Sequence, residues 1–91
     1  MSAKYKIAET DTFSRNIAKP EFKQLSKKLS DYVYPQLKEN PYFGLNVKKL
    51  KGEYEGVYRY RVGSTRVFYL IDASSRTVFL LDIQKRKDSY K

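Results

Sequence analysis

The segment 56–71 constrains the fold of this 91-residue chain most strongly, because it predicts a β-hairpin of fixed register. Two runs rich in β-branched and aromatic residues flank Gly63 and Ser64, as in two strands joined by a tight loop. A two-residue loop with glycine in first place is typical of a type II′ turn, whose twist matches that of the strands it joins. The loop pairs Val62 with Thr65, and every further pair along the hairpin follows from that first one.

The predicted register gives the hairpin one apolar face and one basic face, because side chains alternate along a strand. The apolar face, which should lie on the core, comprises Tyr58, Tyr60, Val67, Tyr69 and Ile71. The basic face comprises Arg59, Arg61, Arg66 and Phe68. Arg61 lies directly opposite Arg66, and such an opposition of like charges costs stability. This indicates a site preset for an anion such as a nucleic-acid phosphate. The alternative is a solvated face, or arginines paired with Glu53, Glu55 or Asp88.

Composition narrows the classes of partner and of chemistry. The net charge of +9 and the sequence pI near 9.8 favour a polyanionic partner: nucleic acid, a membrane surface or an acidic protein. The absence of histidine and cysteine excludes the classical hydrolase triads and thiolate metal sites. The four glycines are scattered rather than grouped in a phosphate-binding loop, and the acidic residues show no metal-ligand spacing. We therefore expect no metal and no cofactor.

The length of the chain is enough for one modest core, so we expect a single domain over residues 1–91. No apolar run is long enough to span a bilayer, and the first ten residues lack the apolar core of a signal peptide. A protein without cysteine is also compatible with a reducing compartment. From these features we expect no membrane-spanning segment.

The N-terminal half predicts an edge strand and two helices. Residues 4–9 read as a short strand, and the polar side chains that follow can cap a helix that carries Phe13 and Ile17. Pro20 ends that helix and suits the first turn of the next one. The second helix has one apolar stripe, formed by Phe22, Leu25, Leu29, Tyr32, Val33 and Leu37. Pro35 should kink this helix or begin a fresh turn.

The strand at 77–83 is apolar on both faces, which predicts a place in the interior of the sheet. The order β-α-α-β-β-β with short connections predicts an α+β fold, an antiparallel sheet with two N-terminal helices packed on one face. The strand at 77–83 must lie beside the second strand of the hairpin, so that its end returns to the hairpin turn. We expect this to bring Lys85 and Arg86 towards the arginines of the hairpin.

The basic and aromatic residues suit one reaction that needs no metal, the cleavage of RNA by its own 2′-hydroxyl. Fixed arginines can stabilise the extra negative charge on phosphorus but serve poorly as the base, since guanidinium stays protonated. Lys85 is a candidate base because neighbouring cations disfavour its charged form, and Glu53 and Glu55 are weaker candidates. Tyr90 offers an acid or a base-stacking ring. The simpler alternative is that the tail binds phosphates and catalyses nothing.

The pattern KKLKGEYEGVYRYRVGSTRVFYLID, followed by KRKDSY, resembles the core of the RelE/ParE toxin superfamily, most closely its RelE/StbE branch. The resemblance covers nearly the whole chain and includes the NPYFG loop, the hairpin and the final RKDSY. It implies a RelE-like fold and a cytoplasmic toxin of a type II toxin-antitoxin system, a ribosome-dependent mRNA endonuclease or mRNA interferase. The implied partners are a cognate acidic antitoxin, the ribosome and mRNA, with a monomer when free. The superfamily also leaves open a non-enzymatic ParE-like gyrase inhibitor, or an inactive homologue that binds an antitoxin.

The resemblance also implies roles for individual residues. Arg59 and Arg61 match basic residues that activate the 2′-hydroxyl and contact phosphate, and Arg66 matches the arginine that stabilises the transition state. Arg86 matches the residue that protonates the leaving group, and Tyr90 the tyrosine that stacks on the substrate base. The expected catalytic set is Arg59, Arg61, Arg66, Lys85, Arg86 and Tyr90. The expected RNA-binding set is Lys48, Lys49, Lys51, Phe68 and Lys87. Arginines stand where the best-studied member has lysines, and a lysine where some members have histidine, so the base stays open.

Overall fold

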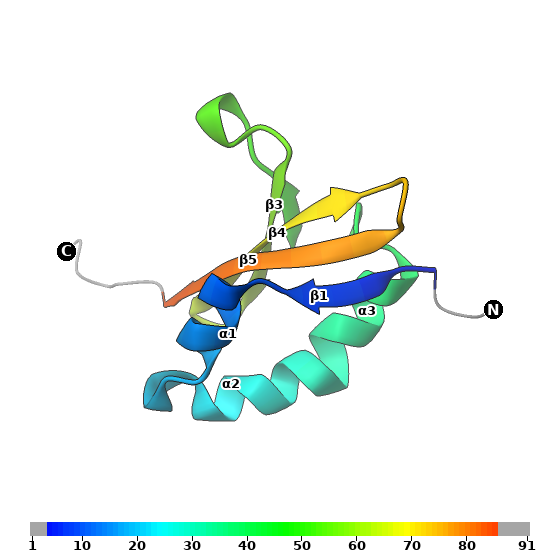
Figure 1. Ribbon diagram of the computed structural model, residues 1–91. Helices are drawn as coiled ribbons and strands as arrows, with labels where there is room; N and C mark the ends of the chain where they lie inside the picture. The colour runs from blue at the N-terminus through cyan, green and yellow to red at the C-terminus, as the bar shows by residue number, and fades with distance from the viewer. Residues whose placement is uncertain (1–3, 86–91) are drawn as a thin grey trace.

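The computed structural model describes residues 4–85, which form an α+β fold with a five-stranded sheet and helices packed against one of its faces (Figure 1). This confirms the predicted fold class. In chain order the elements are β1 (Lys6–Glu9), α1 (Asp11–Ile17), the 3₁₀ turn η1 (Pro20–Phe22), α2 (Lys23–Lys28), the π-helical turn η2 (Leu29–Val33), α3 (Tyr34–Glu39), β2 (Val47–Lys49), the 3₁₀ turn η3 (Gly52–Tyr54), β3 (Val57–Val62), β4 (Thr65–Asp72) and β5 (Thr77–Lys85).

The strands lie in the order β1-β5-β4-β3-β2, and β2 to β5 form the predicted antiparallel meander. The sheet is mixed rather than wholly antiparallel, because β1 runs parallel to β5, with Lys6 beside Thr77. Strands joined by tight turns must alternate in direction, whereas β1 reaches its neighbour through the helices and the whole meander. The strand at the N-terminus is an edge strand, as predicted, and β5 is an interior strand.

The hairpin has the predicted register at every pair from Val62–Thr65 to Val57–Leu70. Gly63 has φ 59°, and Arg76 is the one non-glycine residue with positive φ between residues 4 and 85, so Ser64 lies on the ordinary side. Positive φ at the first central residue alone is the signature of a type II′ turn. The tight loop therefore aligns the two strands as the sequence predicts.

A β-bulge in β5 sets the faces of its last residues. The pairing shifts between Phe68 and Tyr69, so that Tyr69 lies opposite Leu80 and Phe68 opposite Asp82. One extra residue in a strand changes which side chains reach the core. The shift lets both Leu80 and Ile83 be buried on the helix side.

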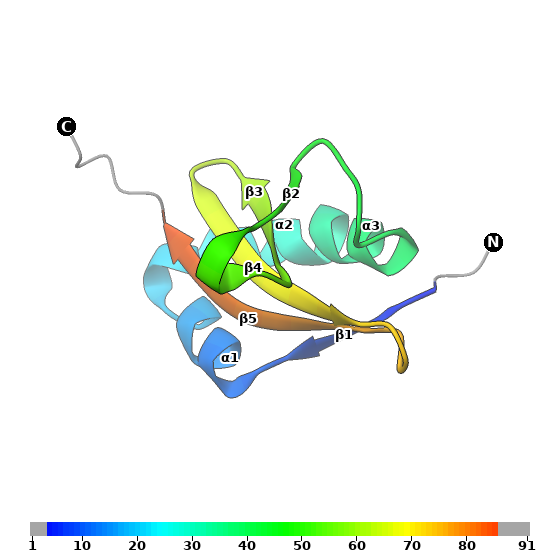
Figure 2. The same ribbon diagram turned by 90° about the horizontal axis from the view of Figure 1, so that it is seen from above.

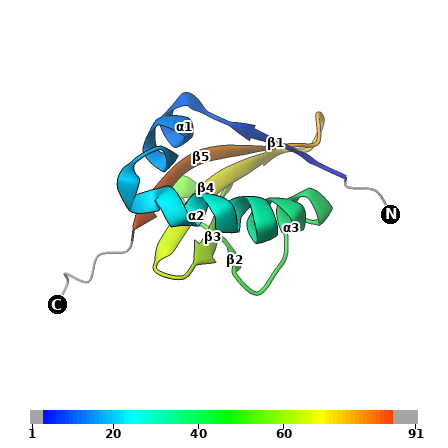
Figure 3. The same cartoon turned by 90° about the horizontal axis from the view of Figure 1, so that it is seen from below.

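The helices cover one face of the sheet (Figures 2 and 3). The Thr10 hydroxyl fixes the start of α1, since its Oγ1 accepts from the Phe13 N–H at 3.3 Å and donates to the Leu80 carbonyl at 2.8 Å. A side-chain cap of this kind stabilises a helix by about 1 kcal/mol. The same hydroxyl thus ties α1 to β5 beyond the end of β1. Of the described helices, α1, α2 and α3 leave the opposite face free, and the 3₁₀ turn η3 projects on that side (Figures 1 and 2). No described helix is long and apolar enough to cross a membrane.

The predicted kink at Pro35 takes the form of a π-helical turn, η2. Proline has no N–H to donate to the carbonyl four residues back, and the preceding N–H, that of Tyr34, donates to Leu29 five residues back instead. The wider turn keeps Leu29 and Val33 in the core but leaves Tyr32 69% exposed. The prediction that Tyr32 belongs to the apolar stripe is therefore wrong, because it assumed an unbroken α-helical period.

The core lies between the helices and the sheet, and its polar atoms are hydrogen-bonded. The Tyr69 hydroxyl donates to the Pro41 carbonyl at 2.8 Å, and the Tyr60 hydroxyl donates to Gln36 Oε1 at 2.6 Å. The buried apolar residues are Phe13, Phe22, Leu29, Val33, Leu37, Tyr60, Val67, Tyr69, Val78, Leu80 and Ile83. Burial of one such side chain stabilises the fold by about 1.5–3 kcal/mol. The core thus holds rigid the strands that carry the basic residues on their other face.

Candidate nucleic-acid interface

The face of the sheet opposite α1, α2 and α3 carries the predicted basic residues. Arg61 lies directly opposite Arg66, and Arg59 lies opposite Phe68. Lys48 on β2 is paired with Arg59, so its side chain belongs to the same face. We name this group, Arg59, Arg61, Arg66 and Lys48, the arginine face. It presents four cations on three adjacent strands, with Phe68 half-buried among them.

The predicted lysine cluster is divided by the register. Lys48 lies in a row that continues through Arg59 and Phe68. Lys49 is paired with Tyr58, whose ring packs on the helix side, and so belongs to the opposite face. Lys51 is exposed in the segment before η3. Lys48 is therefore the lysine of this cluster that shares a face with the hairpin arginines.

The arginines of this face have no acidic partner among residues 4–85. In this part of the chain the one ion pair joins Lys27 Nζ to Asp31 Oδ2, at 3.5 Å on α2 and η2. The alternative that Glu53 or Glu55 neutralises the arginines is therefore not observed, and Asp88 lies outside the described residues. The basic face is not a set of internal ion pairs within the described chain.

Two guanidinium nitrogens on the arginine face are buried without a hydrogen-bond partner among residues 4–85. They are Nε of Arg59 and Nε of Arg66. A buried donor left unpaired costs about 1–3 kcal/mol, and buried polar groups without partners are rare in folded proteins. An anion bound here would supply acceptors for both donors. The unpaired nitrogens are therefore the local feature that most directly indicates a ligand.

The same crowding alters the electrostatics of Arg59. Burial lowers the pKa of its guanidinium, and the charges of Arg61 and Arg66 lower this pKa further. A guanidinium remains protonated at neutral pH even so. The three arginines therefore form a fixed concentration of positive charge rather than a proton acceptor.

The structure places Lys85 differently from the prediction. The end of β5 does return to the hairpin turn, with Gln84 opposite Arg66 and Lys85 opposite Thr65. Directly paired residues share a face, so Lys85 lies on the side of Thr65 and Ile83 and not on the arginine face. The end of β5 therefore lies beside the hairpin turn as expected, but the side chain of Lys85 starts from the face opposite the arginines. Three further predicted residues, Arg86, Lys87 and Tyr90, lie outside the described part of the chain.

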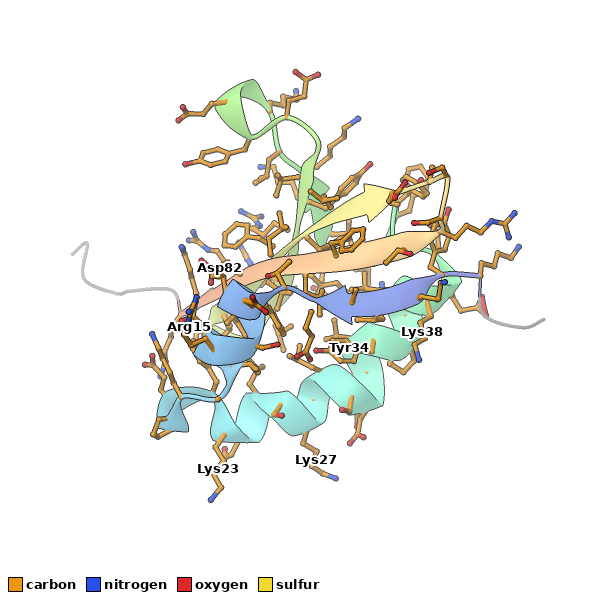
Figure 4. The ribbon with its side chains drawn as sticks, viewed as in Figure 1. Arg15, Lys23, Lys27, Tyr34, Lys38 and Asp82 are labelled. Atoms are coloured by element: carbon orange, nitrogen blue, oxygen red, sulfur yellow. The ribbon has the colours of Figure 1, made fainter. Side chains whose placement is uncertain are left out.

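Asp82 and Gln84 are two residues of this region that sequence reasoning missed. Asp82 lies opposite Phe68 at the edge of the arginine face, and Figure 4 shows it beside α1. Its Oδ1 accepts from Asn16 Nδ2 at 2.6 Å and from the Ile83 N–H at 2.7 Å. Counting back from the turn between β4 and β5 would have placed Leu81 opposite Phe68. The bulge shifts this pairing by one residue, and no residue type at 80–82 signals it.

Comparison with known proteins gives the family. The model of the ParE toxin of type II toxin-antitoxin systems, parDE, matches residues 16–90. The chain belongs to this family. It is a toxin of the RelE/ParE/YoeB group, which confirms the resemblance found in the sequence. No curated protein matches the chain.

Solved structures agree with this assignment. The toxin-antitoxin complex RelBE2 from Mycobacterium tuberculosis contains a chain that is 25% identical, with a TM-score of 0.78 over 97% of this chain and 98% of that chain. The YoeB/ParE toxin from Agrobacterium tumefaciens is 21% identical, with a TM-score of 0.70 and coverage of 90% and 99%. The isolated E. coli RelE toxin is 22% identical, with a TM-score of 0.68 and coverage of 93% and 87%. The last two likenesses show the fold alone.

Proposed function

We propose that this toxin is an mRNA endonuclease that acts on the translating ribosome and cleaves RNA through its 2′-hydroxyl without a metal. The observation that carries the proposal is the arginine face, with its two buried and unpaired guanidinium nitrogens. A phosphodiester is an anion with several acceptor oxygens, which is the ligand such donors lack. The uncovered sheet gives a polynucleotide access to these side chains.

The chemistry follows from the order of the cations across the sheet. Arg61 and Arg66 flank one position from two strands, where they can stabilise the extra negative charge that develops on phosphorus. Their geometry is held by the sheet, so little reorganisation is needed at the moment of reaction. Arg59 and Lys48 lie next in the register and would hold a neighbouring phosphate. Phe68 offers a ring beside them.

The proton of the 2′-hydroxyl needs a different acceptor, because guanidinium stays protonated. Lys85 lies on the other face at the end of β5. Asp82 is the carboxylate of the described chain nearest in register to Arg66 on the arginine face, and its Oδ2 makes no hydrogen bond among residues 4–85. A carboxylate is a competent general base. Asp82 is therefore a candidate general base, to be tested by substitution together with Lys85, Glu53 and Glu55.

Toe-printing of an mRNA in a translating extract tests the proposal. The wild-type protein should create new 3′ ends within the reading frame, and these should require translation. The Arg66→Gln variant should lose this activity, whereas Arg76→Gln removes the same charge from the exposed far end of the sheet and should keep it. An intact message at protein concentrations that arrest growth would refute the endonuclease proposal.

The alternative is a gyrase inhibitor without enzymatic activity, which the match to the ParE toxin model favours. A supercoiling assay with purified gyrase discriminates between the two. Inhibition of supercoiling together with an intact message would replace the first proposal by this one. An effect in neither assay would indicate an inactive homologue that still binds an antitoxin.

We also propose that a cognate acidic antitoxin covers the arginine face in the cytoplasm. Four of the similar structures are toxin-antitoxin complexes: RelBE2, the archaeal RelE-RelB from Pyrococcus horikoshii, E. coli RelBE and YoeB-YefM from Staphylococcus aureus. The charge of +9 suits an acidic and largely disordered partner that folds as it binds. Such a partner would neutralise the unpaired arginines and block the same surface that we assign to RNA.

A further inference from the structure

A pocket of about 380 Å³ adjoins the arginine face at Arg61, between the long helical segment and the edge of β3. Its lining residues are Lys28, Tyr32, Val33, Asn46, Tyr60, Arg61, Val62 and Gly63. Next to the pocket, β2 pairs with residues 58–60 of β3. The Arg61 N–H donates to the Asn46 carbonyl at 3.0 Å, which brings these two lining residues side by side. Figure 3 shows the turn between β3 and β4 projecting past α2 at this place.

An exposed aromatic ring stands in this pocket. Tyr32 is 69% exposed, although it belongs to a helix whose other large apolar residues nearby are buried. The π-helical turn that Pro35 imposes is what turns Tyr32 out of the core. Such turns cost helical regularity and are found frequently at functional sites. An exposed ring of this size offers a flat surface for stacking.

The charges of the pocket are of one sign. Lys28 and Arg61 are among the lining residues, and no carboxylate is. Lys28 has no ion pair with a carboxylate among residues 4–85, whereas its neighbour Lys27 pairs with Asp31 and projects away from the sheet (Figure 4). Asn46 adds an amide group and Arg61 also belongs to the arginine face. The pocket is therefore continuous with the candidate site and combines an aromatic ring, two cations and an amide.

We propose that this pocket binds one nucleotide of single-stranded RNA, with the base stacked on Tyr32 and a phosphate held by Lys28. The nucleotide would be the one next to the phosphate on the arginine face, because Arg61 is shared between the two sites. The inference rests on the proposed function, in that the substrate is RNA. Stacking on aromatic rings beside basic side chains is the common mode by which proteins bind single-stranded RNA. An acidic peptide could pair with the cations of the pocket, but it has no base to stack on the ring of Tyr32.

Binding of a fluorescent single-stranded RNA that carries 2′-O-methyl groups throughout tests the pocket, since this RNA cannot be cut through its 2′-hydroxyl. Tyr32→Ala should weaken binding about tenfold, the scale of losing one stacked base. Tyr54→Ala is the matched control, because Tyr54 is 59% exposed and lies outside the pocket. Replacing the bases of the RNA one at a time by abasic sites should reveal one position that matters to the wild type and not to Tyr32→Ala.

Two matched lysine variants test the contribution of the positive charge in the pocket. Lys28→Gln should lower the slope of log affinity against log salt by about one, as expected for one lost phosphate contact, while Lys27→Gln should not. Equal binding by wild type, Tyr32→Ala and Lys28→Gln would overturn the proposal, as would no measurable binding of the RNA by the wild type. A Tyr32→Ala variant that loses affinity for the antitoxin and not for the RNA would overturn it in favour of a peptide. Pocket-dependent binding without cleavage of unmodified mRNA would leave the pocket standing and refute the endonuclease.

Discussion

Replacement of Arg66 by glutamine should separate function from stability on the arginine face. Arg66 faces Arg61 across the hairpin and has no acidic partner among residues 4–85. Removal of one of two opposed like charges should raise the free energy of unfolding by a few tenths to about 1 kcal/mol. For a domain of this size that corresponds to a melting temperature about 1 to 8 °C higher. Glutamine keeps much of the stem, so little packing is lost.

The same substitution should lower single-turnover mRNA cleavage about 100-fold or more, the scale of losing one preorganised transition-state donor. Melting and cleavage should be measured on one preparation, with Arg76→Gln as the control for the change in net charge. The double variant with Arg61→Gln should gain less stability than the two single gains together, because either change alone removes the repulsion. A clearly lower melting temperature with cleavage intact would show that Arg66 is structural, and the catalytic assignment of the hairpin would fall.

Three further predictions test the remaining residues. Binding to ribosomes or RNA should weaken steeply as the salt concentration rises. Lys48→Gln should reduce the slope of log affinity against log salt by about one, and Lys49→Gln, on the other face, should change this slope less. An affinity independent of salt would contradict the phosphate assignment. Lys85→Met should change binding more than the cleavage step at saturating protein, since the register turns Lys85 from the arginine face; a large loss in the cleavage step would restore Lys85 as the base. Antitoxin binding should slow amide exchange within 57–85, and unchanged exchange throughout this range would count against an antitoxin on the arginine face.

The hairpin could be predicted pair by pair because its information is local. Gly63 fixes the turn type, the turn fixes the first pair, and alternation then assigns each side chain to a face. The helix caps and the edge strand could likewise be predicted from short stretches of sequence. The direction of β1 could not be obtained in this way, because it depends on a partner at the other end of the chain.

Two local irregularities account for most of what the sequence did not predict about the site. The bulge in β5 moves Asp82 and Gln84 onto the arginine side and Lys85 off it, while Leu80 and Ile83 both lie in the core. The π-helical turn displaces Tyr32 from the apolar stripe. Pro35 predicts that the helix is irregular near this residue. Its missing N–H is equally compatible with a kink and with a π-helical turn, in which hydrogen bonds join residues five apart.

The position of β5 between β1 and β4 also determines when the sheet can be completed during protein synthesis. The segments that emerge first include β1, which has no strand to pair with until Thr77–Lys85 has been made. Until then β4 exposes an unpaired edge, and the closing contacts join distant parts of the chain, which is a slow class of folding event. The rigid strands beneath the arginine face therefore gain their last neighbour only when Thr77–Lys85 has been made.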